Sequence, residues 1–217
     1  MGLLLTAAAN LNQAYNVALT EMNKLEAGLR CGQSGAACRM VNGTAQKVIT
    51  LPFLGRTCQL TLPDGVFEFW ADDREVPLWV KIILLHYLSR ATGAPLRGDL
   101  ITFRQIPGGD TYFNNFCKRS VHRLVQFFAG KPDLLLAASK VVGGVRVAYG
   151  DLAVGIPVLP RVPLTLILWE AVEGFPASFN ILFDASVPQY LSTEDIVVLC
   201  QELTSMLIST AKGSTCS

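Results

Sequence analysis

Over the first third of the chain, apolar positions first repeat with the period of a helix and then form runs typical of strands. Apolar residues recur on one helical face between residues 11 and 29, which predicts an amphipathic helix. A loop rich in Gly, Ser and Cys is expected over residues 30–43. Runs rich in β-branched and aromatic residues then predict strands over residues 47–53, 57–62 and 66–70.

The segment from Pro77 to Thr92 predicts a helix with clear ends. Pro77 suits the first helical turn, Gly93 suits the left-handed position after the last turn, and Pro95 prevents continuation. Because this helix is apolar on most sides, we expect it to be a central buried helix at about residues 77–92.

The remaining pattern mixes helices and strands. A short strand is expected over residues 99–105, followed by helices over 111–129 and 132–142. The last third is rich in β-forming residues, with runs over 152–159, 164–171 and 177–184. Capping-box residues at 192–195 open a final helix.

These elements predict an α+β fold, in which an antiparallel sheet is covered by helices. The length fits a single α+β domain over residues 1–217, with possible subdomains at 1–76 and 77–217.

The composition narrows the classes of function. Apolar residues make up 51% of the 217 residues and charged residues 16%, with a formal net charge of +1. This excludes a disordered chain, and it argues against nucleic-acid binding through a basic surface. A mean hydropathy of +0.38 is high for a small monomer. We therefore expect an apolar pocket, a surface for a partner protein, or a homodimer interface.

No stretch of apolar residues reaches the roughly 20 that a membrane-spanning helix needs. The longest candidate, residues 77–88, is interrupted by Lys81 and His86. The start of the chain lacks the positively charged region of a signal peptide. A cytoplasmic location is therefore expected.

Motifs for nucleotide binding and nucleophilic catalysis are missing from the sequence. It contains no G-x-x-x-x-G-K-[ST], no G-x-G-x-x-G and no G-x-S-x-G. Cys117 and His122 lie five positions apart on one helix and would point about 140° apart, which excludes a catalytic dyad. The sequence thus favours a protein that is not an enzyme.

Six cysteines are present, and none forms a C-x-x-C pair. Cys31, Cys38 and Cys58 are the candidate metal ligands, but the spacing of the first two matches no zinc or iron–sulfur motif. Unligated thiols are the simpler interpretation, and a Cys31–Cys38 redox pair is an alternative that depends on geometry.

Other polar side chains have two interpretations each. His86 is either a hydrogen-bonded core histidine or an axial ligand to a cofactor. Glu173 and Asp184 follow two consecutive strands, where they either hold a proton or a cation, or simply form turns. Arg104 and Arg161, with Arg119, form either an anion-binding group or ordinary surface arginines.

Several motifs resemble the bacterial and archaeal family called domain of unknown function 3786, in order over residues 11–207. In the first half they are Phe53-Leu54-Gly55, Glu75-Val76-Pro77, Leu85-His86-Tyr87-Leu88, Ile101-Thr102-Phe103-Arg104, Pro107-Gly108-Gly109 and Tyr112. In the second half they are Leu159-Pro160-Arg161-Val162-Pro163, Leu168-Trp169-Glu170, Glu173, Phe175-Pro176-Ala177, Leu182-Phe183-Asp184-Ala185-Ser186 and Tyr190-Leu191-Ser192-Thr193-Glu194-Asp195. Members of that family come largely from strict anaerobes, and some carry an iron–sulfur segment. The resemblance implies a role near corrinoid, iron–sulfur or one-carbon metabolism.

The leading prediction is a non-catalytic binding or accessory protein with an apolar pocket for a corrinoid or another tetrapyrrole such as haem. Tetrapyrroles need apolar walls and few polar contacts. The predicted cofactor-binding residues are His86, Arg104, Tyr112, Phe113, Arg161, Trp169, Glu173, Phe175 and Asp184.

Two alternatives stay open. One is an interaction or assembly protein whose apolar surface binds a redox or iron–sulfur enzyme, or a second copy of the chain. The other is an enzyme that uses Glu173, Asp184, Arg104 and Arg161.

Overall fold

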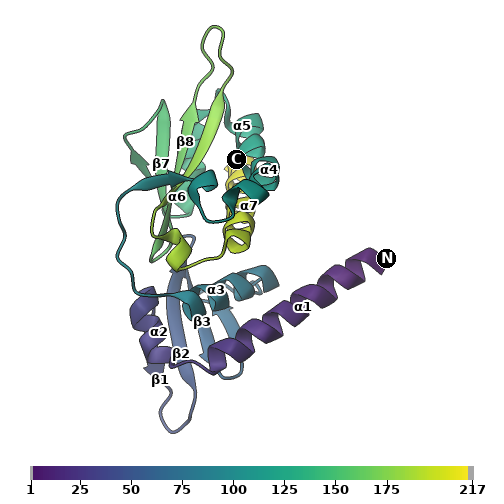
Figure 1. Ribbon diagram of the computed structural model, residues 1–217, viewed down its shortest axis with the longest axis vertical. Coiled ribbons are helices and arrows are strands. Elements are labelled where there is room, and N and C mark those ends of the chain that lie inside the picture. The colour runs from purple at the N-terminus through teal and green to yellow at the C-terminus, as the bar shows by residue number, and fades with distance from the viewer. Residues whose placement is uncertain (1, 215–217) are drawn as a thin grey trace. The chain divides into compact units, whose positions relative to one another are not determined.

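A computed structural model describes the backbone of residues 2–214 and the side chains of residues 10–213 (Figure 1). The fold is α+β, as predicted, and the chain forms two compact units. The first unit comprises Met1–Pro95 with Gln189–Leu191, and the second comprises Leu96–Pro188 with Ser192–Ser217. The chain passes between them after Pro95, so the helix that the sequence analysis placed at the start of a second subdomain belongs to the first unit.

The first unit contains a four-stranded antiparallel sheet. Its order is β1 (Ala37–Met40), β2 (Lys47–Phe53), β3 (Arg56–Leu62) and β4 (Val66–Phe69). The three strands predicted over 47–70 are confirmed, whereas β1 lies in the segment predicted to be a loop. Buried residues alternate along β3 and β4, as expected for a sheet with one face packed against helices.

Three helices complete the first unit: α1 (Gly2–Asn23), α2 (Ala27–Ser34) and α3 (Leu78–Arg90). The single helix predicted over residues 11–29 is wrong, because the chain breaks before Glu26. The Glu26 carboxylate accepts hydrogen bonds from the backbone N–H groups of Gly28 at 3.1 Å and Leu29 at 2.5 Å, and so caps the start of α2.

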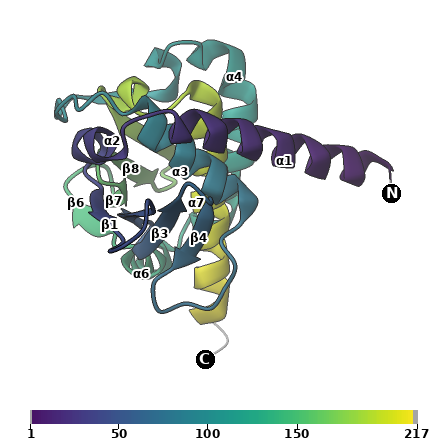
Figure 2. The same cartoon turned by 90° about the horizontal axis from the view of Figure 1, so that it is seen from below.

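Helix α3 is the buried helix that the sequence predicts. Its buried side chains are Val80, Ile82, Ile83, Leu84, Leu85, Tyr87 and Leu88. Helix α1 packs against α3 (Figure 2). Within the described residues, no helix has the length and apolar character needed to cross a membrane.

The second unit contains a five-stranded antiparallel sheet. Its order is β5 (Leu100–Thr102), β9 (Ser178–Asp184), β8 (Val162–Trp169), β7 (Leu152–Leu159) and β6 (Val145–Val147). The prediction of β7 is confirmed over its whole length, and β6 was not predicted. Strand β6 is only three residues long and mostly exposed, so it gives no periodic signal.

Four helices and a π-helical turn accompany this sheet. They are α4 (Gly109–Phe116), α5 (His122–Phe128), α6 (Pro132–Val141) and α7 (Thr193–Ser214). The helix predicted over 111–129 is interrupted by one π-helical turn, Cys117–Val121. Figure 1 shows α4, α5 and α7 on one side of the sheet. On the β8 and β9 strands that side carries the buried residues Leu164, Leu166, Leu168, Phe179, Ile181 and Phe183.

Candidate functional site

The second unit contains a small pocket, called the aromatic pocket below, between the end of α4 with the π-helical turn that follows it and strand β9. Its volume is about 180 Å³. It is lined by Thr102, Phe103, Arg104, Phe113, Phe116, Cys117, Val121 and residues 179–182. Two of the predicted cofactor-binding residues, Arg104 and Phe113, therefore lie together in it.

Stacked aromatic rings form one wall of the aromatic pocket. The rings of Phe103 and Phe116 are parallel within 5°, and their centroids are 4.1 Å apart. Both residues are almost fully buried, and both rings also contact the ring of Phe183 in β9. Because the pair is held by the core, this wall is rigid.

A cation–aromatic pair forms the rim. The guanidinium carbon of Arg104 lies 3.8 Å from the centroid of the Phe113 ring, and its Nη1 donates a 2.8 Å hydrogen bond to Asp110. The Asp110 carboxylate therefore offsets the charge of Arg104 while the planar guanidinium stays on the ring.

Gly109 sets the distance between the two chain segments that carry this pair. A Cβ atom at Gly109 would lie 2.0 Å from the carbonyl oxygen of Phe103. Only glycine therefore lets α4 approach the short helical turn at residues 103–105 this closely.

Trp169 lies outside the pocket and is hydrogen-bonded to Asn180. The indole Nε1 of Trp169 donates a 3.1 Å hydrogen bond to Oδ1 of Asn180, and Trp169 is 45% exposed. Both residues lie on the face of the sheet opposite the buried aromatic residues, because alternate residues of a strand point to opposite faces.

Cys117 is a thiol of low reactivity within the pocket. Its pKa is raised above the ordinary value because burial opposes the charged form, and the nearby Arg104 offsets only part of this effect. The thiol therefore stays protonated at neutral pH and is a poor nucleophile.

Tyr112, a third predicted residue, connects two helices. Its hydroxyl donates a hydrogen bond to the carboxylate of Glu194 in α7. The contact raises the pKa of Tyr112 and lowers that of Glu194, since it favours the protonated phenol and the ionised acid. Thr193 adds a 2.6 Å hydrogen bond to the carbonyl of Pro107. Tyr112 thus helps to hold α4 against α7.

The strand register does not support the interpretation in which Glu173 and Asp184 together hold a proton or a cation. Trp169, the last residue of β8, pairs with Ser178, the first residue of β9, whereas Asp184 ends β9. In an antiparallel pair the carboxyl ends of the two strands lie at opposite ends of the pair. Glu173 follows β8 and Asp184 follows β9, so the two carboxylates are separated by the length of the hairpin.

The remaining predicted residues lie at exposed or half-buried positions. Glu173 and Phe175 belong to the turn between β8 and β9, where Phe175 is 72% exposed. Arg161 lies half-buried in the turn between β7 and β8. His86 lies half-buried on α3 in the first unit.

The three candidate metal-binding cysteines lie in the first unit. Cys31 in α2 and Cys58 in β3 are buried, and Cys38 in β1 is exposed. The part of the chain that the structure describes holds no group of three or more His, Cys, Asp or Glu side chains arranged to bind a metal.

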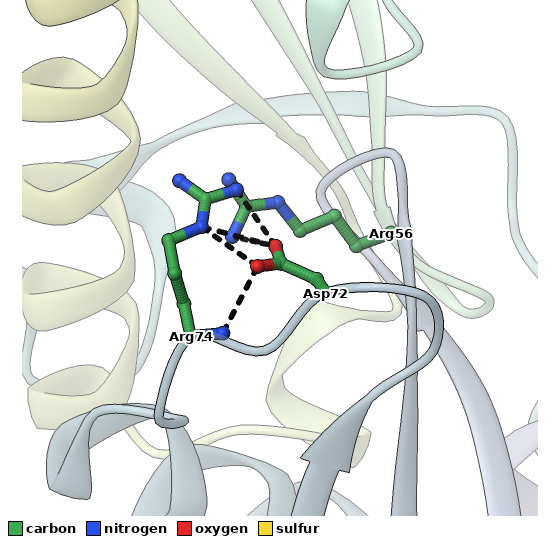
Figure 3. A network of polar contacts seen from close by, with 3 residues as sticks. All are labelled: Arg56, Asp72 and Arg74. Carbon is green, nitrogen blue, oxygen red and sulfur yellow. Dashed lines mark hydrogen bonds and ion pairs between the residues drawn. The ribbon is translucent and has the colours of Figure 1, made fainter.

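A polar cluster that follows β4 was not predicted from the sequence (Figure 3). The Asp72 carboxylate accepts hydrogen bonds from Arg74 Nε at 2.8 Å and Nη2 at 2.7 Å, and it lies 3.5 Å from Arg56 Nη1. Bonding to the Arg74 side chain lowers the pKa of Asp72 to about 2. The sequence signal that could have revealed it is the Asp-Asp-Arg run at residues 72–74, directly after a strand. Because the Asp72 carboxylate contacts both arginines, this cluster stabilises the turn that follows β4.

A family model matches residues 33–206. The chain belongs to the family described as a domain of unknown function (DUF3786). The resemblance inferred from the sequence is thereby confirmed. The DUF3786 match runs from the end of α2 into α7 and includes every residue of the aromatic pocket. No curated protein and no solved structure matches the chain.

Proposed function

We propose that this DUF3786 chain is a non-catalytic binding protein, and that its second unit binds a planar, apolar group in the aromatic pocket. The observation that supports this proposal is the pairing of Arg104 with Phe113 beside the stacked Phe103 and Phe116 rings. Aromatic walls and one well-placed polar group are typical of small-molecule sites.

The volume limits the size of the ligand. Sites for drug-sized molecules usually enclose about 300–1,000 Å³, whereas this pocket holds about 180 Å³. One ring system fits, or one edge of a larger molecule. A corrinoid or haem stays a prediction under this proposal, with only an edge of the macrocycle entering the pocket beside the Arg104–Phe113 pair.

The chemistry of the lining supports binding rather than catalysis. Among the described residues that line the pocket, the ionisable side chains are Arg104 and Cys117. An arginine stays charged at all ordinary pH values, and the Cys117 thiol stays protonated at neutral pH. Neither group is suited to accept a proton from a substrate.

An NMR titration tests the location of the site. We expect 2-naphthol and 2-naphthoate to shift backbone amide signals of residues 102–117 and 179–182. Shifts confined to other residues, or no shifts with either compound, would contradict the proposal.

A second titration, with hemin and aquacobalamin, tests the tetrapyrrole prediction. An absorbance change that is lost in Phe113→Ala would place the macrocycle at the aromatic pocket. A change that is lost only in His86→Ala would instead place the macrocycle at the predicted axial ligand. The aromatic pocket would then not be the tetrapyrrole site.

Exposed apolar residues on the β8–β9 turn favour a second candidate function, the binding of a partner protein. Trp169, Val172 and Phe175 are 45%, 66% and 72% exposed. Val172 and Phe175 also exchange two backbone hydrogen bonds, of 3.0 and 2.9 Å, which close the turn. Sedimentation across a range of concentrations tests self-association: a dimer that is lost in Phe175→Ser supports this surface, and a monomer throughout excludes a homodimer.

A further inference from the structure

Two cysteines of the first unit lie where the chain turns from α2 into β1. Helix α2 ends at Ser34, and Gly35 follows with a φ of 77°, a left-handed conformation that favours glycine. The N–H of Ala36 then donates a 3.0 Å hydrogen bond to the carbonyl of Cys31. This bond folds the start of β1 back against the last turn of α2, which carries Cys31.

The strand register directs Cys38 toward the same place. Cys38 pairs with Ile49 of β2, and Ile49 is fully buried. Residues directly opposite each other in an antiparallel pair point to the same face of the sheet. Cys38 therefore points to the packed face, and α2 packs against both β1 and β2.

The two thiols interact, but they differ in access to solvent. Burial, and next the neighbouring Cys38, raise the pKa of Cys31 to about 12. Cys31 is only 2% exposed, whereas Cys38 lies exposed on the edge strand. An external molecule can thus reach Cys38, while Cys31 can be reached from within the protein by Cys38.

We propose that Cys31 and Cys38 form a reversible intramolecular disulfide by exchange with a low-molecular-weight disulfide such as glutathione disulfide. This site does not rest on the proposed ligand-binding function, because it uses residues of the first unit alone.

The exchange has two balanced steps. The Cys38 thiolate first attacks one sulfur of the small disulfide, forms a mixed disulfide and releases one thiolate, which takes up a proton. Cys31 then loses its proton to solvent and attacks the Cys38 sulfur, which closes the Cys31–Cys38 bond and releases the second thiol. Two electrons pass from the protein dithiol to the small disulfide.

Cys58 is too far away to take the place of Cys31. Strand β2 lies between β1 and β3, so Cys58 and Cys38 stand two strands apart. With strands about 4.8 Å apart, this separation is roughly 10 Å, beyond the Cα distance of about 4.4–6.8 Å that a disulfide allows.

The sequence offers a direct test. Trypsin cleaves after Arg30 and Arg39, so one peptide, residues 31–39, contains both cysteines and no internal cleavage site. The native full-length protein is equilibrated in glutathione buffers from fully reduced to fully oxidised, denatured, alkylated with iodoacetamide, digested and weighed.

We expect the 31–39 peptide to carry two alkyl groups in the reduced buffer. In the oxidised buffer we expect it to carry none and to be two hydrogen atoms lighter, and re-reduction should restore the first state. The peptide containing Cys200 serves as the control and should stay alkylated throughout. Double alkylation in the oxidised buffer would overturn the proposal, as would a bond from Cys38 to any cysteine other than Cys31.

Single variants test the order of attack. In Cys31→Ser, Cys38 should accumulate as the mixed disulfide with glutathione, since the second step is blocked. In Cys38→Ser, Cys31 should remain fully alkylated at every buffer ratio. A glutathione adduct on Cys31 would contradict the proposed order. If a variant does not fold, the wild-type peptide alone decides the proposal.

Discussion

The carboxylate of Asp184, at the end of β9, accepts a 2.8 Å hydrogen bond from the backbone N–H of Gly98. It also accepts bonds from the backbone N–H groups of Arg97 at 3.1 Å and Ser186 at 2.9 Å. A residue that the sequence suggested for cofactor binding or catalysis thus fixes the chain before β5 to the end of β9. Burial alone would raise the pKa of Asp184, but the hydrogen bonds outweigh it and lower the pKa.

Replacing Asp184 should destabilise the second unit. Asp184→Asn removes the charge that strengthens three backbone hydrogen bonds, and we expect a loss of about 1–3 kcal/mol in the free energy of unfolding. Exposed Asp99→Asn, one residue after Gly98, is the matched control and should change stability by less than about 0.5 kcal/mol. Urea unfolding measures both, and equal losses would contradict this role.

The pH dependence of stability should follow from the same carboxylate. Its pKa is lower in the folded state than in the unfolded chain, so its contribution is fully present above pH about 4 and is lost as the pH falls through the folded pKa. Between pH 5 and pH 2, wild-type protein should lose more stability than Asp184→Asn. Parallel curves for the two proteins would argue against the role given to Asp184.

The cluster around Asp72 predicts which of its two arginines has the larger effect on the pKa of Asp72. Hydrogen bonding to Arg74 is the main cause of the lowered pKa, and Arg56 contributes least. By NMR titration the carboxyl of Asp72 should titrate at about 2 in the wild type. Its pKa should rise more in Arg74→Ala than in Arg56→Ala, and the reverse order would be inconsistent with the geometry in Figure 3.

Two glycine substitutions should have opposite effects. Gly109→Ala places a Cβ atom against the carbonyl oxygen of Phe103 and should destabilise the protein by about 1–3 kcal/mol, because backbone must move. At Gly32, inside α2, a Cβ meets nothing within 4 Å. Gly32→Ala should therefore stabilise by about 0.5–1 kcal/mol. Thermal unfolding of the two variants provides the comparison, and a neutral Gly109→Ala would show that α4 does not depend on this close approach.

Much of the fold follows from local pattern. The strands over residues 47–69 and 152–184 and the apolar helix α3 carry strong periodic or continuous apolar signals, so the sequence predicts them well. The break before Glu26 escaped prediction because the apolar stripe continues across it, while the backbone tightens at Lys24 and Leu25 and the Glu26 side chain caps a new helix. Strand β1 is exposed along its whole length, so it shows no alternation to detect.

The site was predicted less well, because it depends on which distant residues meet. Arg104 and Phe113 were both chosen from the sequence, but their contact depends on the close approach at Gly109. The stacked Phe103 and Phe116 looked like ordinary core residues. One of the two interpretations of Glu173 and Asp184 brought them together, and the antiparallel register of β8 and β9 shows that they lie apart.

The central claim is that the aromatic pocket binds a planar, apolar group, and a matched pair of phenylalanine variants tests it most directly. Phe113 and Phe127 are both half-buried and both lie beneath a cationic side chain, but only Phe113 lines the pocket. We predict that Phe113→Ala weakens the binding of 2-naphthol, measured by calorimetry, by about 2- to 12-fold, because one aromatic contact is worth about 0.5–1.5 kcal/mol. Phe127→Ala should leave the dissociation constant unchanged. Equal dissociation constants for the two variants, or no binding to the wild type, would contradict the account.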